Sequence, residues 1–129
     1  MIKLIIKGSL PNLNNYIDAC RNNKYGAASL KKMVEHKLIF EFKAQLKEPL
    51  KEKYHIQIKW YERDRKRDPD NIAFAKKFIL DALVKGGLLR NDGWNEIAGF
   101  TDEFYVDKSK PRIEVYIKEV QNAQGKQKT

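Results

Sequence analysis

The sequence contains only one cysteine, Cys20, and only two histidines, His36 and His55. One cysteine cannot form an intramolecular disulfide, and neither histidine has the spacing to Cys20 that a zinc finger requires. The chain also has no apolar run near the roughly 20 residues that a membrane-spanning helix needs. Its first residues, MIKLIIKGSL, are too short and too interrupted for a signal peptide. We therefore expect a cytoplasmic protein without a membrane partner.

Familiar motifs for nucleophilic catalysis and nucleotide binding are also absent. None of Ser9, Ser29 and Ser109 lies in a G-x-S-x-G sequence, and the chain has no G-x-x-x-x-G-K-[ST] loop. Cys20 has no evident base partner. A serine or cysteine nucleophile and a P-loop are therefore poorly supported, and we expect no small-molecule cofactor.

Basic residues, in contrast, are abundant. The 129 residues include 26 Lys and Arg against 17 Asp and Glu, which gives a formal net charge of +9. This excess favours a polyanionic partner, with nucleic acid ahead of an acidic membrane. The densest basic run lies between Lys59 and Arg67, although a solvated loop explains such a run equally well. A hydrophobic share of 42% and this length fit one globular domain with one core.

The pattern of apolar residues predicts an α+β domain over residues 1–120, with helices packed on a small sheet of about four strands. The expected strands are residues 2–7, 54–63, 97–106 and 112–119. The expected helices are a short irregular one before residue 22, a long one over 27–47, and one from Pro69 to about Val84. The turn DKSKPR predicts that the last two strands form a hairpin. Residues 121–129 have no core positions and are expected to form a flexible tail.

Three charged side chains and one phenylalanine lie close together in the third predicted helix. On a helical wheel, Asp70, Phe74, Lys77 and Asp81 share one stripe opposite the apolar face, and Lys76 falls outside it. Asp68 occupies the N-cap position before Pro69. The stripe is compatible with an ordinary solvent face on which Lys77 and Asp81 form an i,i+4 pair.

Asp92 changes this interpretation, because it lies in a glycine-flanked loop just past the helix. From there we expect its carboxylate to swing back beside Asp68 and Asp70. Three neighbouring carboxylates repel one another unless a cation neutralises them, and Mg²⁺ or Mn²⁺ prefers such oxygen ligands. The basic run would hold a polyanion while the metal polarises its scissile phosphate. A D-x-D pair alone is weak support, since it also occurs in polymerases and glycosyltransferases.

The ordered motifs RDPDN, KKFILDAL, a glycine-containing turn and NDGW strongly resemble the RusA family of Holliday junction resolvases. The segment LPNLNNY is similar to the family's N-terminal segment, though less specifically. Length, basic character and strand–helix order agree along nearly the whole chain. The resemblance implies a RusA-like mixed sheet and a homodimeric, Mg²⁺-dependent endonuclease, with Mn²⁺ as a substitute metal. Such an enzyme places paired symmetric nicks in four-way junctions during DNA recombination and repair.

The resemblance also assigns roles to individual residues. Asp68, Asp70 and Asp92 would be metal ligands, Lys77 the catalytic lysine, and Asp81 a supporting carboxylate and a further candidate ligand. The side chains expected to contact DNA are Arg63, Arg65, Lys66, Arg67, Lys76, Asn14 and Asn15.

Two departures from the family pattern keep other functions open. Asn91 replaces the first acid of the D-D pair, and the spacing from Asp70 to Asp81 is about one helical turn longer. The alternatives are a non-catalytic junction-binding protein with the same fold, and a metal nuclease acting on other branched nucleic acids. No pattern locates a dimer interface. Phe40, Trp94 and Phe100 are candidates that core packing explains at least as well.

Overall fold

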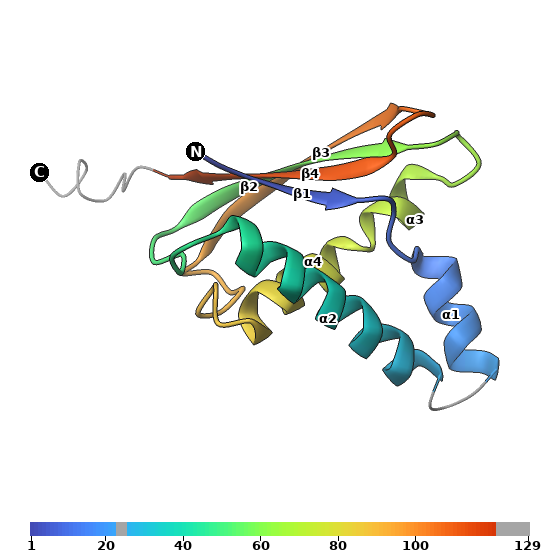
Figure 1. The fold of residues 1–129 in the computed structure, drawn as a ribbon, viewed down its shortest axis with the longest axis horizontal. Helices are drawn as coiled ribbons and strands as arrows, with labels where there is room; N and C mark the ends of the chain where they lie inside the picture. Colours follow the sequence, from blue (N-terminus) through green and yellow to red (C-terminus); the bar gives the residue numbers. More distant parts are fainter. Residues whose placement is uncertain (23–25, 121–129) are drawn as a thin grey trace, which may run out of the picture.

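The computed structural model describes residues 1–22 and 26–120 (Figure 1). Its elements are β1 (Ile2–Lys7), α1 (Leu13–Asn22), α2 (Gly26–Gln45), β2 (Tyr54–Glu62), α3 (Pro69–Ala73), α4 (Lys76–Lys85), β3 (Ile97–Val106) and β4 (Arg112–Glu119). The predicted α+β fold with a four-stranded mixed sheet is confirmed. No helix in the described ranges is long and apolar enough to cross a membrane. The expected flexible tail at 121–129 lies outside the described residues.

The four strands form one sheet in the order β1-β4-β2-β3. β4 runs antiparallel to both β1 and β2, whereas β3 runs parallel to β2. The predicted β3–β4 hairpin is therefore wrong, because β2 lies between these two strands. The burial of the strands fits this order. Ile113, Glu114 and Val115 of β4 are buried on both faces of the sheet, as in a central strand, whereas six of the ten residues of β3 are exposed, as in an edge strand.

The helices all lie on one face of the sheet, with α2 and α4 side by side beneath it (Figure 1). Alternate residues of β2 point into this layer, as the period-two pattern predicted. Ile56, Ile58 and Trp60 are at most 2% exposed and pack in one core with Phe42 of α2 and Ile79 of α4. This core fixes the end of β2, from which the candidate site extends.

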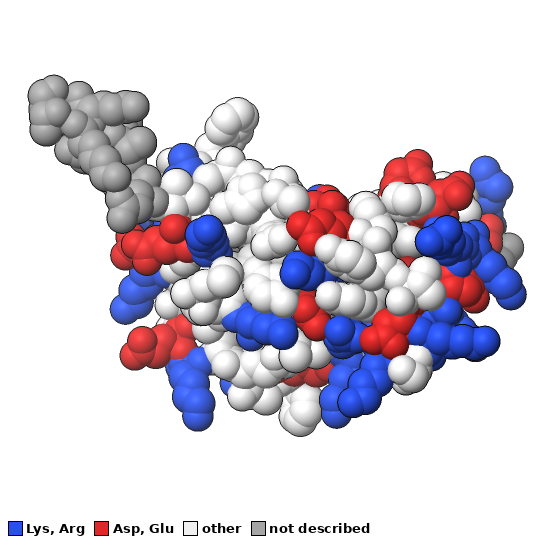
Figure 2. Space-filling model, turned by 90° about the horizontal axis from the view of Figure 1, so that it is seen from above, with Lys and Arg blue, Asp and Glu red and all other residues white. Residues whose placement is uncertain are grey.

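No helix within residues 1–22 and 26–120 covers the opposite face of the sheet, which carries polar and aromatic side chains. The rings of Tyr61 and Tyr105 stack with centroids 5.0 Å apart, and the Arg112 guanidinium lies 3.9 Å above Tyr61. The Tyr116 hydroxyl donates to Glu114, and this hydrogen bond raises the pKa of Tyr116. Figure 2 shows cations and carboxylates interleaved across this face.

The helix predicted from Pro69 to Val84 is interrupted, which is a second correction. The backbone changes to i→i−3 hydrogen bonds at Ala75, Lys77 and Phe78, so α3 and α4 are separate helices. Packing explains the break. The Phe74 ring packs 5.6 Å from Tyr16 of α1 and 5.9 Å from Phe78. Phe74 therefore faces its neighbours rather than solvent, and the predicted stripe does not continue from Asp70 to Asp81.

Candidate active site

Two exposed aspartates stand where the chain enters α3. Asp68 is the N-cap residue with extended backbone angles, as predicted, but its carboxylate makes no capping hydrogen bond. Asp70 lies in the first turn and accepts one hydrogen bond, 2.9 Å, from the backbone N–H of Asn71. Neither carboxylate forms an ion pair with a residue that the structure describes. The capping explanation for Asp68 therefore fails, and its oxygens are available to an external cation.

Arg67 fastens the segment that carries these aspartates. Its guanidinium donates to the backbone oxygen of Leu10 at 2.9 Å and lies 3.4 Å from the Glu62 carboxylate at the end of β2. Burial raises the pKa of Glu62, while the positive charge of Arg67 opposes this shift. Arg67 was predicted to contact DNA; in the structure its guanidinium contacts Leu10 and Glu62, next in sequence to Asp68.

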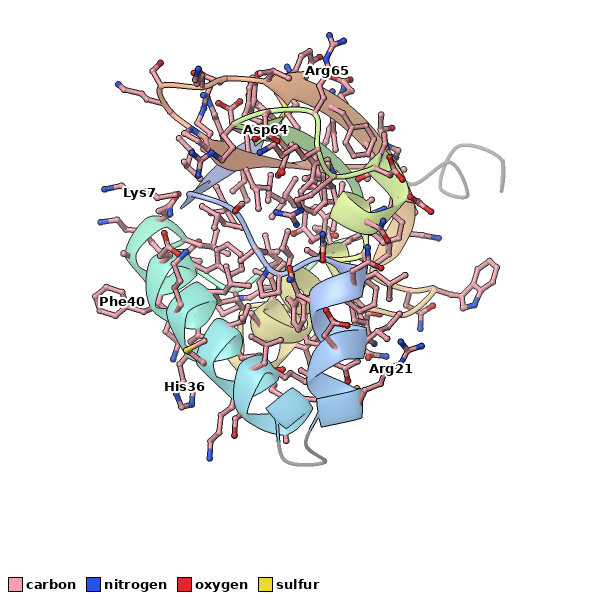
Figure 3. All side chains as sticks on the ribbon, turned by 90° about the vertical axis from the view of Figure 1, so that its right-hand side faces the viewer. Lys7, Arg21, His36, Phe40, Asp64 and Arg65 are labelled. Atoms are coloured by element: carbon pink, nitrogen blue, oxygen red, sulfur yellow. The ribbon has the colours of Figure 1, made fainter. Side chains whose placement is uncertain are left out.

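A hollow of about 600 Å³ with several basic side chains lies beside the contact between Arg67 and Glu62. It is lined by Gly8, Ser9, Glu62, Arg63, Asp64, Lys66, Arg67 and Pro111. Arg63, Arg65 and Lys66 are exposed, and Figure 3 shows Arg65 extending outward beside Asp64 at this end of the molecule. The predicted DNA-contacting run is thus divided: three side chains face solvent, and Arg67 is held by the protein.

The two lysines at the start of α4 have different environments. The Lys77 side chain is 65% exposed, and its ammonium lies 3.6 Å from Asp81. Asp81 is also 3.4 Å from Lys31, so it links α4 to α2. Lys76 is four-fifths buried and lies 2.6 Å from Asp102 of β3. Lys77 is therefore the more accessible of the two lysines, and Asp81 is already engaged by two cations.

Asp102 is a partner that sequence reasoning missed. One of its oxygens binds Lys76, and the other accepts a 2.8 Å hydrogen bond from the Trp60 indole. The Lys76 ammonium also lies 4.6 Å from the centroid of the Phe100 ring. The sequence did contain a sign of this partnership. Asp102 alternates with Phe100 and Phe104 on the inward side of the strand, where an acid needs a partner. This network fastens the start of α4 to the edge of the sheet.

The asparagines near the N-terminus have a local structural role. Asn15 N–H donates to the Asn12 side chain at 2.8 Å, and Asn12 N–H donates to the Asn15 side chain at 3.0 Å. This reciprocal pair is an asparagine version of the capping box, and the N-x-x-N spacing was its sequence signal. Asn14 is exposed. Of the two asparagines predicted to contact DNA, Asn15 is therefore partly occupied as the cap of α1.

Asp92 lies at the other end of the sheet. Gly93 accepts backbone hydrogen bonds from Glu96 and Ile97, and Glu96 in turn accepts from Tyr54, the first residue of β2. Asp68 adjoins Arg67, which contacts Glu62, the last residue of β2. At about 3.3 Å per residue, β2 separates these ends by about 26 Å. Within the described residues the three aspartates are therefore not gathered into one cluster.

Consistent with this separation, the described residues contain no group of three or more His, Cys, Asp or Glu side chains that could hold a metal ion. Asp68 and Asp70 alone fit the carboxylate pair with which Mg²⁺ is often bound, since this ion keeps waters and substrate oxygens as its other ligands.

Exposed carboxylates beside a basic hollow suit a protein that acts on a polyanion. A family model described as "Endodeoxyribonuclease RusA" matches residues 5–118. The chain therefore belongs to the RusA family of endodeoxyribonucleases, which act on branched DNA junctions. A search of curated proteins found no match. The family membership confirms the resemblance inferred from the ordered motifs.

Proposed function

We propose that this protein is a Mg²⁺-dependent endonuclease that resolves four-way DNA junctions in the cytoplasm by paired nicks in opposed strands. The observation that supports this most is the exposed Asp68–Asp70 pair, in a chain that belongs to an endodeoxyribonuclease family. Asp68 and Asp70 would hold the ion. When bound, Mg²⁺ polarises a scissile phosphate and lowers the pKa of an attacking water.

The residues around this pair would bind and orient the DNA. Arg63, Arg65 and Lys66 are exposed cations next to Asp68, and they suit the phosphates of an approaching strand. Arg67 would keep the aspartates in place through its contacts with Glu62 and Leu10. Lys77, exposed on the first turn of α4, is the proposed source of positive charge or of a proton for the leaving oxygen.

Junction affinity is expected to fall steeply with salt, because phosphate contacts release counterions. Each neutralised phosphate contributes about −0.9 to the slope of log K against log salt concentration. Replacing Arg63, Arg65 and Lys66 by Gln should make this slope shallower by up to about 3 and weaken binding. The control replaces Lys47, Lys51 and Lys53, which are exposed near the start of β2, by Gln and should change the slope less. Salt-independent affinity of the wild-type protein would contradict the electrostatic account.

The two lysines of α4 are expected to respond differently to replacement. Lys77→Met should slow nicking by about 10²–10⁴-fold with little change in melting temperature. Lys76→Met should instead lower the free energy of unfolding by roughly 1–3 kcal/mol, because Asp102 loses its cation while half-buried. Single-turnover nicking rates and thermal denaturation of both variants separate the two roles. Wild-type nicking by Lys77→Met would remove it from the proposed mechanism.

The direct test of function compares a synthetic immobile four-way junction with a plain duplex of the same sequence. Each is incubated with the protein in Mg²⁺ or in EDTA, and the products are separated on a denaturing gel. We expect nicks in the junction only, and only with Mg²⁺. Tight junction binding without product would favour the non-catalytic alternative, for which Asn91 in place of an acid is the supporting observation. Nicking of flaps or forks in preference to the junction would favour the broader nuclease.

A further inference from the structure

The open face of the sheet, on the side away from the helices, has no part in the proposed nicking reaction. We propose that this face binds single-stranded DNA, with bases stacked on Tyr105 and Tyr116 and a phosphate held between them by Lys59. This binding site is separate from the Asp68–Asp70 pair, and the inference does not rest on the nicking activity.

The first argument is the charge of this face (Figure 2). The strand register arranges its residues in rows, because paired residues on neighbouring strands point to the same side of the sheet. Five cations and two carboxylates occupy these rows: Lys3, Lys7, Lys59, Arg112 and Lys118, with Glu103 and Glu114. A surface with this balance of charge attracts a polyanion.

The two carboxylates are already engaged within the face. Glu114 is 5% exposed and accepts a 2.6 Å hydrogen bond from the Tyr116 hydroxyl. Glu103 accepts hydrogen bonds from the Gln57 amide at 2.8 Å and from the Tyr105 hydroxyl at 2.6 Å. These bonds also hold the two tyrosine rings in place, which lowers the entropic cost of stacking a base on them.

The second argument is a stack of flat groups that ends at an exposed ring. The Arg112 guanidinium lies 3.9 Å from the centre of the Tyr61 ring. The rings of Tyr61 and Tyr105 stack with centroids 5.0 Å apart and an angle of 20° between their planes. Tyr105 lies on the edge strand and is 43% exposed, so its outer ring face is the next place in the stack. A nucleobase is a flat ring that can extend such a stack.

The third argument is the position of Lys59 between two tyrosines. Tyr105 of β3 pairs with Tyr61 of β2, and Lys59 lies two residues before Tyr61. Tyr116 of β4 pairs with Gln57, which lies two residues before Lys59. Tyr105, Lys59 and Tyr116 therefore form a diagonal across three strands, whose ends are about 16 Å apart at 4.8 Å per strand and 3.3 Å per residue. A DNA strand along this diagonal has an aromatic ring for a base at each end and an ammonium group for a phosphate at its middle.

Further cations lie near both ends of the diagonal. The ammonium groups of Lys59 and Lys3 lie 5.1 and 5.5 Å from the centre of the Tyr116 ring. Lysine side chains are flexible, so these groups can move from the ring to the phosphates of a bound strand while a base takes their place. At the other end, Tyr61 is close in sequence to Arg63, an exposed cation that lines the hollow. A DNA strand leaving the open face there would meet the basic side chains of the hollow.

Binding of short oligonucleotides in EDTA tests this site without nicking. A labelled oligothymidine and an abasic strand of the same length carry the same phosphates and differ only in their bases. Fluorescence anisotropy should show that the wild type binds the oligothymidine more tightly. Tyr105→Ala should weaken this binding by about 5–150-fold and leave the affinity for the abasic strand unchanged. Tyr105→Phe, which keeps the ring, should bind as the wild type does.

Phe40→Ala is the matched control, because Phe40 is an exposed aromatic residue on α2 and projects away from the sheet (Figure 3). It should change neither affinity. Equal affinity of the wild type for the two strands, or wild-type affinity in Tyr105→Ala, would overturn the proposal. If Tyr105→Ala does not fold, Tyr116→Ala decides by the same comparison: loss of affinity for the oligothymidine alone supports the site, and unchanged affinity overturns it.

The phosphate contact has its own test. Lys59→Gln should make the slope of log K against log salt concentration shallower by about 0.7 for the oligothymidine, the share of one phosphate on a single strand. An unchanged slope would overturn the diagonal path. Asp70→Asn should bind the oligothymidine as the wild type does, so absence of nicking would contradict the proposed function and leave this inference standing.

Discussion

Asp70→Asn is expected to abolish nicking of four-way junctions while leaving junction affinity near that of the wild type. The substitution keeps the size of the side chain and removes the charge that a hard cation requires. The loss should exceed the roughly 10–100-fold that removal of an outer-shell partner typically causes. Asp70 is exposed and makes one local hydrogen bond, so the free energy of unfolding should change by less than about 0.5 kcal/mol.

The matched control for this prediction is Asp18→Asn, an exposed aspartate on α1. It changes the net charge by the same amount and should leave the nicking rate unaltered. The measurement is single-turnover nicking beside a binding titration in EDTA for all three proteins. Wild-type nicking by Asp70→Asn would remove the D-x-D pair from the active site. Weakened binding with normal nicking would assign Asp70 to DNA recognition instead.

Arg67→Met is expected to cost stability in a manner that depends on pH. Near neutral pH it leaves the buried Glu62 carboxylate without its cation and also removes the hydrogen bond to Leu10. Together these losses should lower the free energy of unfolding by about 3 kcal/mol. At pH about 4 the loss should fall to about 1 kcal/mol, because protonated Glu62 needs no cation and only the bond to Leu10 is missing.

The sign follows from the pKa of Glu62, which burial raises above its usual value of 4.5. A raised pKa means that the folded state binds the proton more tightly, so this stabilising effect is complete below pH 4.5 and is lost as pH rises through the folded-state pKa. Removing Arg67 enlarges the shift and therefore the loss at neutral pH. Urea denaturation at several pH values measures the loss in the free energy of unfolding. The double variant Glu62→Gln/Arg67→Met is the control and should show no such pH dependence. An equal loss at pH 4 and pH 7 would contradict the assigned role of Arg67.

The strand positions were predictable because they depend on local chemistry. Alternating apolar residues and turn-forming segments placed β3 and β4 at the residues where the structure has them. Which strands pair is not a local property. A short turn between consecutive strands favours a hairpin, but β4, which is buried on both faces over Ile113, Glu114 and Val115, lies inside the sheet and β3 lies at its edge.

The candidate site was predictable to the extent that it is contiguous in sequence. The D-x-D pair and its basic flank follow from neighbouring residues, and the family membership agrees with them. Three features depend on tertiary contacts instead: the break at Phe74, the fastening by Arg67, and the partnership of Lys76 with Asp102. In sequence, Arg67 resembles the exposed cations beside it, and only its contacts with Leu10 and Glu62 distinguish it.

Paired cutting of four-way junctions is the central property proposed for this chain. The most direct measurement labels each of the four strands of an immobile junction in turn and maps the nicks after a short incubation in Mg²⁺. We expect nicks at symmetric positions in two opposed strands. Nicks scattered among all four strands, or equal cutting of the matching duplex, would contradict it.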